Sequence, residues 1–300
     1  MQAYSTRANL FLVTLLGLIW GFNWPIVKLA IVEYGPWTTR ALSLSGATAV
    51  MALMAWRRGD SLRLPLRQQW RAFVPAVVGM AMVNILNAYA QMVMATGRTA
   101  IIAFSMPVWA TALAVVVLGE RLDGRRALGL ALGVCGLAAL AWPSLAQGGF
   151  SAGVALALAS AICWACGAVF MKRFPVESPP LAFATWQMGY AALLLTAGML
   201  AFEGPAPAWR GFTPGFWGLA YNIVAAQALG TWIWFGVLTR SPASVAAIGT
   251  LMTPGVGVVG AMLLLGEIPS PADWTGLALV VGACAVVLGA RPAPAPRSAA

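Results

Sequence analysis

Residues 20–28 read WGFNWPIVK and residues 164–172 read WACGAVFMK, so that a Trp, the small residue after it and a Lys recur 144 positions later. The same displacement relates Pro36 to Pro180. Further matches share a displacement of 147: Trp70 with Trp217, Pro107 with Pro254, Gly119-Glu120 with Gly266-Glu267, and Gly129 with Gly276. The small change in displacement is what one loop-length difference produces, so the second half of the chain repeats the first.

The composition is that of a membrane protein. Of the 300 residues, 61% are hydrophobic and only 9% are charged, whereas a soluble domain carries about 25% charged residues. Apolar stretches of the roughly 20 residues that a membrane-spanning helix needs recur along the chain. Because lipid offers no partner to an open sheet edge, the spans must be helices. We predict an all-α polytopic membrane protein with ten transmembrane helices at 9–32, 37–56, 70–94, 98–119, 125–142, 151–172, 180–202, 213–238, 243–264 and 272–289.

The basic residues set the predicted orientation. A net charge of +10 would favour nucleic-acid binding in a soluble protein, but the cations lie in short connections between spans, so we expect no nucleic-acid partner. With a cytoplasmic N-terminus, 14 of the 18 Lys and Arg residues fall on the cytoplasmic side and 4 on the other, as the positive-inside rule requires. An even number of spans then makes both termini cytoplasmic.

Each half contains an odd number of predicted spans. Five lie in 9–142 and five in 151–289, so the second repeat enters the membrane from the opposite face. Inverted repeats place a substrate site near the midplane between the halves, and rocking about that site gives alternating access. This symmetry favours a transporter over an enzyme. The tail at 290–300, rich in Pro and Ala, is predicted to be a disordered cytoplasmic segment.

The repeated pattern resembles a known family. Each half has a Trp, a small residue and a Lys in its first helix, and a Pro followed by Gly-Glu in its fourth. Two such EamA-type repeats are similar to those of the drug/metabolite transporter superfamily, over roughly residues 9 to 290. Within it, the chain most resembles the YddG-like exporters of aromatic amino acids. The resemblance implies ten helices, cytoplasmic termini, export across a bacterial inner membrane, and a cavity lined by the first four helices of each repeat.

Polar side chains inside spans are the first candidate binding residues, because they are costly in lipid unless they face protein or water. Those of the third span share one helical face, and the repeat places similar groups in the eighth. We predict a substrate cavity lined by Met80, Asn84, Asn87 and Gln91 of the third span and Gln227, Thr231 and Trp234 of the eighth. The alternative is that the amides bond to neighbouring helices.

Deep aromatic residues form a second candidate group. Trp20 and Asn23 share a face of the first span, and Trp164 is the repeat mate of Trp20. Aromatic walls with a few amides suit a flat apolar solute with a polar head. Ordinary packing is the alternative use of any one of these rings.

Two prolines near the middle of the fourth and ninth spans are candidate hinges. Pro107 and Pro254 each remove a backbone donor. The resulting kink would shape the cavity or move with it, although a fixed bend is an equally simple interpretation. Met106 and Thr253, which adjoin these prolines, are predicted to face the cavity.

The acidic residues favour a facilitator. All eight fall in loops or at predicted span ends, and histidine is absent, whereas a proton-coupled pump usually carries an ionisable group inside the membrane. We therefore predict a uniporter, with a proton-coupled multidrug exporter and a lipid-carrier flippase as alternatives. A membrane enzyme would need a nucleophile–base pair or a metal constellation, and the sequence offers neither.

The basic residues and cysteines limit the partners further. Lys28, Arg40 and Lys172 are the cations nearest to the membrane interior, and we expect them to be snorkelling anchors and not phosphate ligands. This leaves small neutral or zwitterionic metabolites, with hydrophobic amino acids favoured. Cys163 and Cys166 form a C-x-x-C without a second ligand pair, so we expect four buried thiols, no metal and no cofactor. We expect a monomer.

Overall fold

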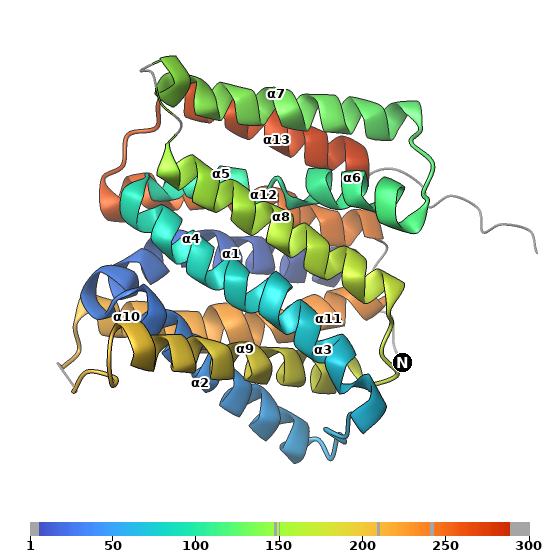
Figure 1. Cartoon of the computed structure of the whole chain (residues 1–300), viewed down its shortest axis with the longest axis vertical. Helices are drawn as coiled ribbons and strands as arrows, with labels where there is room; N and C mark the ends of the chain where they lie inside the picture. Colours follow the sequence, from blue (N-terminus) through green and yellow to red (C-terminus); the bar gives the residue numbers. More distant parts are fainter. Residues whose placement is uncertain (1–5, 147–148, 150, 209–210, 241–242, 289–300) are drawn as a thin grey trace, which may run out of the picture.

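The structure is a computed structural model that describes residues 6–146, 149, 151–208, 211–240 and 243–288. Within these residues the secondary structure is helical and contains no strand. The helices run roughly along one direction and lie side by side (Figure 1). The predicted tail at 290–300 lies outside the described residues.

The first half supplies five spans. They are α1 (Thr6–Tyr34), α2 (Pro36–Arg57), the composite third span, the broken fourth span and α7 (Gly124–Ala146). The third span begins after a 3₁₀ turn, η1 (Leu66–Gln68), and consists of α3 (Gln69–Ala76), the π-helical η2 (Val77–Ala81) and α4 (Met82–Val93). The fourth consists of α5 (Thr96–Ala103) and α6 (Met106–Leu118).

The second half repeats this order. Its spans are α8 (Ala152–Arg173), α9 (Pro180–Phe202), a composite eighth span, α12 (Ala243–Leu265) and α13 (Pro271–Leu288). The eighth consists of α10 (Pro214–Tyr221), the π-helical η3 (Asn222–Leu229) and α11 (Gly230–Arg240). By length and apolar composition alone, six of the spans in the described chain are able to cross a bilayer. The predicted all-α fold of two five-span halves is confirmed.

The two halves have opposite directions in the bundle. In Figure 1, α1 starts at the end that carries the N-terminus and α8 starts at the other end. We call the first end the arginine-rich end, since it includes the connections around Arg57–Arg71, Gly119–Arg126 and Lys172–Ser178, and the other the opposite end.

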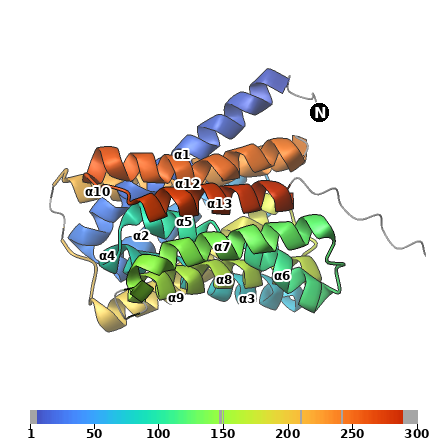
Figure 2. The same ribbon diagram turned by 90° about the horizontal axis from the view of Figure 1, so that it is seen from above.

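Glycines let helices of the two repeats approach closely. α1 packs along α12, where a Cβ on Gly21 would lie 2.4 Å from Val256 and one on Gly17 3.0 Å from the carbonyl oxygen of Gly249. α2 packs against α9, and α7 pairs with α13 at one edge of the bundle (Figure 1). Figure 2 shows α1 tilted relative to its neighbours, with its first turns projecting from the bundle.

The π-helical segments occupy repeat-related places in the third and eighth spans. Val77–Ala81 falls on residues 224–228 of η3 when the displacement of 147 is applied. In the first repeat the widened turn lets Gly79 meet Gly167 of α8, where a Cβ on Gly167 would lie 2.7 Å from the Gly79 Cα. In the second, the Trp20 indole donates a hydrogen bond to the Ala226 carbonyl oxygen (3.0 Å). π-bulges are frequent at functional sites.

The two proline-containing spans differ. The fourth span breaks at Phe104–Ser105, directly before the residues Met106 and Pro107 that start α6. α12 in contrast continues through Pro254 without interruption. The backbone therefore differs at the two repeat-related prolines: the helix breaks before Pro107 but continues through Pro254. Each Pro removes the same backbone donor.

The peripheral α7 has an apolar outer face. Leu128, Val134 and Trp142 are exposed there, as suits a lipid-facing helix. Cys135 is also exposed, so the expectation of four buried thiols is wrong for this residue, because it lies on the outer face of an edge helix. Cys284 is buried, and Cys163 and Cys166 are partly buried.

Candidate functional site

A cavity of about 310 Å³ opens at the arginine-rich end between α6, α8 and α13. Met106, Pro107 and Thr111 line it next to the break in the fourth span. Charged residues line it where the helices end: Glu120, Arg126 and Lys172. Its volume lies within the usual range for small-molecule sites, about 300–1,000 Å³.

Glu120 forms two ion pairs at this cavity, of which the one with Lys172 joins the two repeats. Its carboxylate accepts a hydrogen bond from the Lys172 ammonium of α8 and one from Arg126 Nη2 of α7, the latter at 3.0 Å. The hydrogen bond from Lys172 lowers the pKa of the Glu120 carboxyl, with Arg126 adding to the effect. The pair therefore keeps its charge below the pH at which an ordinary carboxyl protonates.

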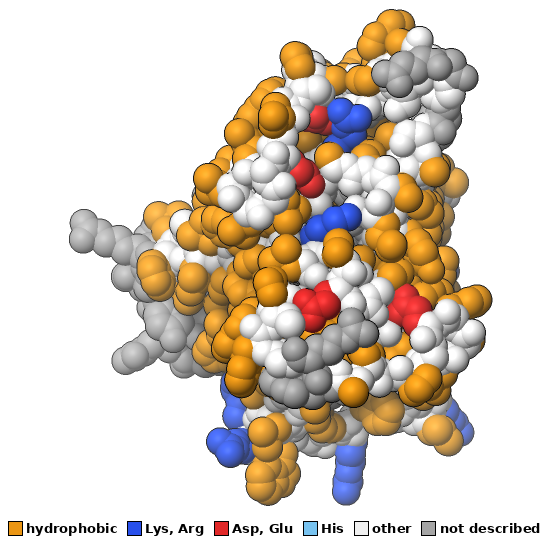
Figure 3. Space-filling view, turned by 90° about the vertical axis from the view of Figure 1, so that its left-hand side faces the viewer, with side chains coloured by type: hydrophobic (Ala, Val, Ile, Leu, Met, Phe, Trp, Pro, Cys, Tyr) orange, Lys and Arg blue, Asp and Glu red, His pale blue; other side chains and the backbone are white. Residues whose placement is uncertain are grey.

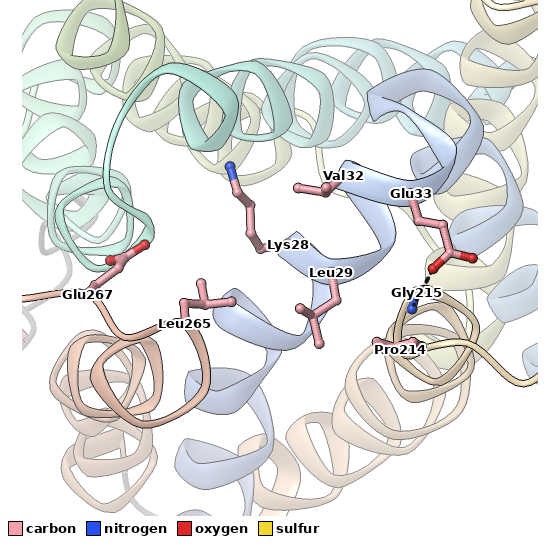
Figure 4. A pocket seen from close by; sticks show the side chains of 8 residues that line it. All are labelled: Lys28, Leu29, Val32, Glu33, Pro214, Gly215, Leu265 and Glu267. Atoms are coloured by element: carbon pink, nitrogen blue, oxygen red, sulfur yellow. Dashed lines mark hydrogen bonds between the residues drawn. The ribbon is translucent and has the colours of Figure 1, made fainter.

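A second cavity, of about 610 Å³, lies at the opposite end between α1, α10 and the end of α12. Figure 4 shows Lys28 and Glu267 on two sides of it, with no bond drawn between them. These residues are the repeat mates of Lys172 and Glu120. Lys28 donates instead to the Gln91 carbonyl oxygen, and Glu267 accepts from the backbone nitrogens of Thr96 (2.7 Å) and Gly97 (2.9 Å), at the start of α5.

Acidic and basic side chains gather over the opposite end, as the space-filling view in Figure 3 shows. Arg98 forms a bidentate ion pair with Asp273, at 2.5 Å from Nε to Oδ1 and 3.1 Å from Nη2 to Oδ2. Glu33 accepts hydrogen bonds from the Thr213 hydroxyl and the Gly215 nitrogen, which joins α1 to α10. These contacts connect elements of the two repeats.

Aromatic rings connect the first helices of the two repeats in the middle of the bundle. Phe104, at the break between α5 and α6, lies 6.1 Å from Trp24 of α1 and 6.0 Å from Trp164 of α8, edge to face in both pairs. Pro107 and Pro254 both line a void of about 20 Å³ beside Phe104. The structure thus brings the two repeat-related prolines together.

The predicted residues of α1 contact the eighth span. The Trp20 ring lies 5.8 Å from the Trp234 ring. Asn23 Oδ1 accepts a hydrogen bond from Asn222 Nδ2 at 2.7 Å. These contacts bring three of the predicted residues to one interface between the repeats.

Several other predicted residues bond within their own helix or pack against neighbouring helices. Asn84 Nδ2 donates to the Met80 carbonyl oxygen of its own helix, and the Thr253 hydroxyl donates to Gly249. The Met80 side chain packs against the clusters that join α2 and α9. Asn87, Gln91 and Thr253 are buried, whereas Gln227 and Thr231 are partly buried. Their assignment to a substrate cavity stays a prediction.

The expectation that Arg40 snorkels is wrong. The residue is only 5% exposed, because α2 is covered here by other helices and its side chain turns inward. Sequence reasoning also passed over Phe104, Asn222 and the role of the repeated Lys and Glu residues. The repeated Lys and Glu residues could have been found from the sequence. Charges that recur in both inverted repeats must lie at equivalent positions near the two ends of the bundle.

The chain matches the EamA-like transporter family over residues 7–142 and 151–289. It is 26% identical over 288 residues to the uncharacterized transporter YvbV of Bacillus subtilis, covering 95% of this chain and 93% of that protein. It is 25% identical to a probable amino-acid metabolite efflux pump of Salmonella typhimurium (92% and 93% covered). A probable terminal-alkyne amino-acid exporter of Streptantibioticus cattleyicolor is 24% identical (89% and 87%).

The fold agrees with a solved structure. A crystal structure of a protein superposes with a TM-score of 0.62 at 22% identity, covering 91% of this chain and 95% of the other. The family match, together with the apolar helices of this fold, defines a multi-pass helical membrane transporter. The chain belongs to the EamA-like transporter family, and the predicted membership of the drug/metabolite transporter superfamily is confirmed.

Proposed function

We propose that this chain exports small neutral or zwitterionic metabolites, with aromatic and hydrophobic amino acids as its main substrates. The observation that carries this proposal is the pair of cavities at the two ends of the bundle, each lined by a Lys of one repeat and a Glu of the other. Repeat-related cavities of this kind suit one path that opens to either side in turn.

The two Lys–Glu pairs differ in a way that suits alternating access. Lys172 and Glu120 are bonded, while Lys28 and Glu267 have separate partners. In the proposed cycle the halves at 9–142 and 151–289 rock against each other. The Lys28–Glu267 pair then forms while the Lys172–Glu120 pair breaks. In this cycle Phe104, which Trp24 and Trp164 contact edge to face, would supply an apolar, aromatic surface to the substrate.

The substrate class has two supports. Aromatic rings favour flat apolar side chains through face and edge contacts, and two relatives carry names that specify amino-acid metabolite or amino-acid export. The family is one of transporters, and we propose no catalytic activity. We propose a bacterial inner-membrane location with the arginine-rich end in the cytoplasm, in line with the positive-inside rule.

We propose uniport because the acidic residues that the structure describes lie near the ends of the bundle. Glu33, Glu203 and Glu267 bond to backbone or hydroxyl groups at the opposite end, and Glu120 bonds to Lys172 and Arg126 at the arginine-rich end. A proton-coupled carrier would need a group that changes protonation within the path.

Phenylalanine flux into proteoliposomes tests this function. We expect saturable uptake of labelled phenylalanine that is the same with and without an imposed proton gradient, since no proton moves with the substrate. The control is protein-free liposomes. Uptake that needs the gradient would contradict uniport and favour the proton-coupled exporter. Absence of phenylalanine uptake, together with uptake of a cationic aromatic drug, would contradict the substrate class.

A further inference from the structure

Two arginines and three aromatic rings form a cluster at the arginine-rich end, where α3 meets the end of α8. The Trp70 ring lies 5.7 Å from the Phe170 ring and 5.2 Å from the Phe174 ring, and the two phenylalanine rings lie 4.9 Å apart. The guanidinium carbon of Arg71 lies 5.6 Å from the centre of the Trp70 ring. That of Arg173 lies 5.3 Å from the centre of the Phe174 ring. Both cations therefore border one aromatic patch, and we call these five residues the Trp70 cluster.

The Trp70 ring lies on the outer surface of the bundle. The helix that carries it, α3, packs between α8 and α9 (Figure 1). Trp70 is 44% exposed, and Phe73, one turn further into the span, is 42% exposed. Exposed aromatic rings near the end of a span are typical of the interface between hydrocarbon and lipid headgroups. The cluster is thus placed where a headgroup meets the protein.

The two arginines have no acidic partner among the described residues. None of the ion pairs in the described chain includes Arg71 or Arg173. Glu177, the acid nearest to Arg173 in the sequence, is exposed and bonds to the Gln68 side chain through its backbone nitrogen. Arg71 donates from Nη1 to the Pro175 carbonyl oxygen at 2.9 Å, while its Nε is buried and has no hydrogen-bond partner. The cluster therefore combines positive charge and an unsatisfied donor with an exposed ring.

The second repeat keeps the aromatic part of the cluster and not the cations. Trp217, the repeat mate of Trp70, lies at the opposite end with its ring 5.3 Å from the Phe216 ring. Gly218 and Leu29 take the positions that match the two arginines. Aromatic rings thus mark both ends of the bundle, whereas the paired arginines mark one. The fold does not require a cation at either position, which favours a binding role for both.

We propose that the Trp70 cluster binds an anionic phospholipid. A guanidinium that stacks on a ring keeps N–H groups at its edge, and these match the oxygens of a phosphate. The exposed rings contact the lipid where headgroup and acyl chains join. Basic pockets between transmembrane helices bind anionic headgroups by the same combination. The bound lipid would hold α3 of the first repeat to α8 of the second, and this site is separate from the proposed substrate path.

Thermal unfolding of the purified protein in a non-ionic detergent tests the site. The probes are phosphatidylglycerol, phosphatidylcholine with the same acyl chains, and inorganic phosphate. We expect phosphatidylglycerol to raise the unfolding temperature at concentrations at least about tenfold lower than phosphatidylcholine, because its headgroup alone has a net negative charge. Inorganic phosphate at the same concentrations should have no effect, since it lacks the chains that hold a lipid at the rings. Equal effects of the two lipids would overturn the proposal, and so would an effect of phosphate equal to that of phosphatidylglycerol.

Arg71→Gln and Arg173→Gln assign the difference to the cluster. Each should weaken the stabilisation by phosphatidylglycerol about fivefold, the usual contribution of one cation at an anionic membrane surface. The effect of phosphatidylcholine should stay within about twofold. Arg173→Gln leaves the bond between Arg71 and Pro175 in place, so it separates lipid binding from folding.

Arg121→Gln is the matched control. It removes the same charge from an exposed residue at the same end, in the connection between α6 and α7. This variant should change the effect of phosphatidylglycerol by less than about twofold. An equal loss in all three variants would show a general attraction of the arginine-rich end for anionic lipid and would overturn the site. The site would also be overturned if neither cluster variant differed from the wild type.

Discussion

Replacing Gly167 by alanine is expected to destabilise the protein by about 1–3 kcal/mol, as other substitutions that overpack a close contact do. The new Cβ would lie 2.7 Å from the Cα of Gly79. The obstacle is backbone and not the end of a flexible side chain, so α8 and the π segment η2 must separate. Thermal unfolding in detergent measures the loss.

Gly282→Ala is the matched control for this substitution. Gly282 lies in α13, and a Cβ there would meet nothing within 4 Å. Because alanine has a higher helix propensity than glycine, the control should gain about 0.5–1 kcal/mol. Equal effects of the two alanines would mean that the contact between α8 and η2 is looser than the structure shows.

Replacing Asp273 by asparagine is expected to destabilise the protein by about 3–5 kcal/mol, the usual effect of removing one partner of a buried ion pair. The side chains of Arg98 and Asp273 are 18% and 7% exposed. The asparagine would leave the guanidinium without a counter-charge. Removing both charges, as in R98M/D273L, should cost less than removing one. A double-mutant cycle on the free energy of unfolding measures this coupling.

The pair at Arg58 and Asp60 is the control for Asp273. Its side chains are 56% and 39% exposed, and exposed pairs contribute little because water screens them. Asp60→Asn should therefore leave the unfolding temperature unchanged. If Asp273→Asn behaved like Asp60→Asn, the Arg98–Asp273 pair would be a surface contact without a role in joining α5 to α13.

The sequence predicts the architecture because membrane spans follow simple rules of length and hydropathy. The repeat from Trp20 to Lys28 and from Trp164 to Lys172 predicts two inverted halves without any tertiary information. It also predicts that Pro107 and Pro254 are equivalent, and the structure places them around one void. The π segments were missed, since they depend on packing between helices and not on residue type. The break at Phe104–Ser105 lies directly before Pro107, where the sequence predicts a kink, whereas α12 continues through Pro254.

The sequence predicts the candidate site less completely than the fold, because the site also depends on tertiary packing. Asn84 and Asn87 lie on one face, but the choice between cavity, own backbone and neighbouring helix depends on side-chain geometry that periodicity does not contain. Arg40 shows this most clearly. At four residues from the start of α2 it reads as an interfacial anchor, yet α2 is covered along this stretch and the guanidinium is buried. The repeat signal was stronger for Lys28, Lys172, Glu120 and Glu267, but only the structure reveals that Lys172 bonds to Glu120 while Lys28 and Glu267 have separate partners.

Cysteine labelling from the two sides of the membrane tests alternating access most directly. In a variant without the four native cysteines, Thr111→Cys reports on the cavity at the arginine-rich end and Leu29→Cys on the opposite cavity. Glu120→Gln, which breaks the pair with Lys172, should speed labelling of Thr111→Cys by an impermeant maleimide and slow that of Leu29→Cys, because the fractions of the two states sum to one. Rates that change at one end only, or in the same direction at both, would contradict alternating access through these two cavities.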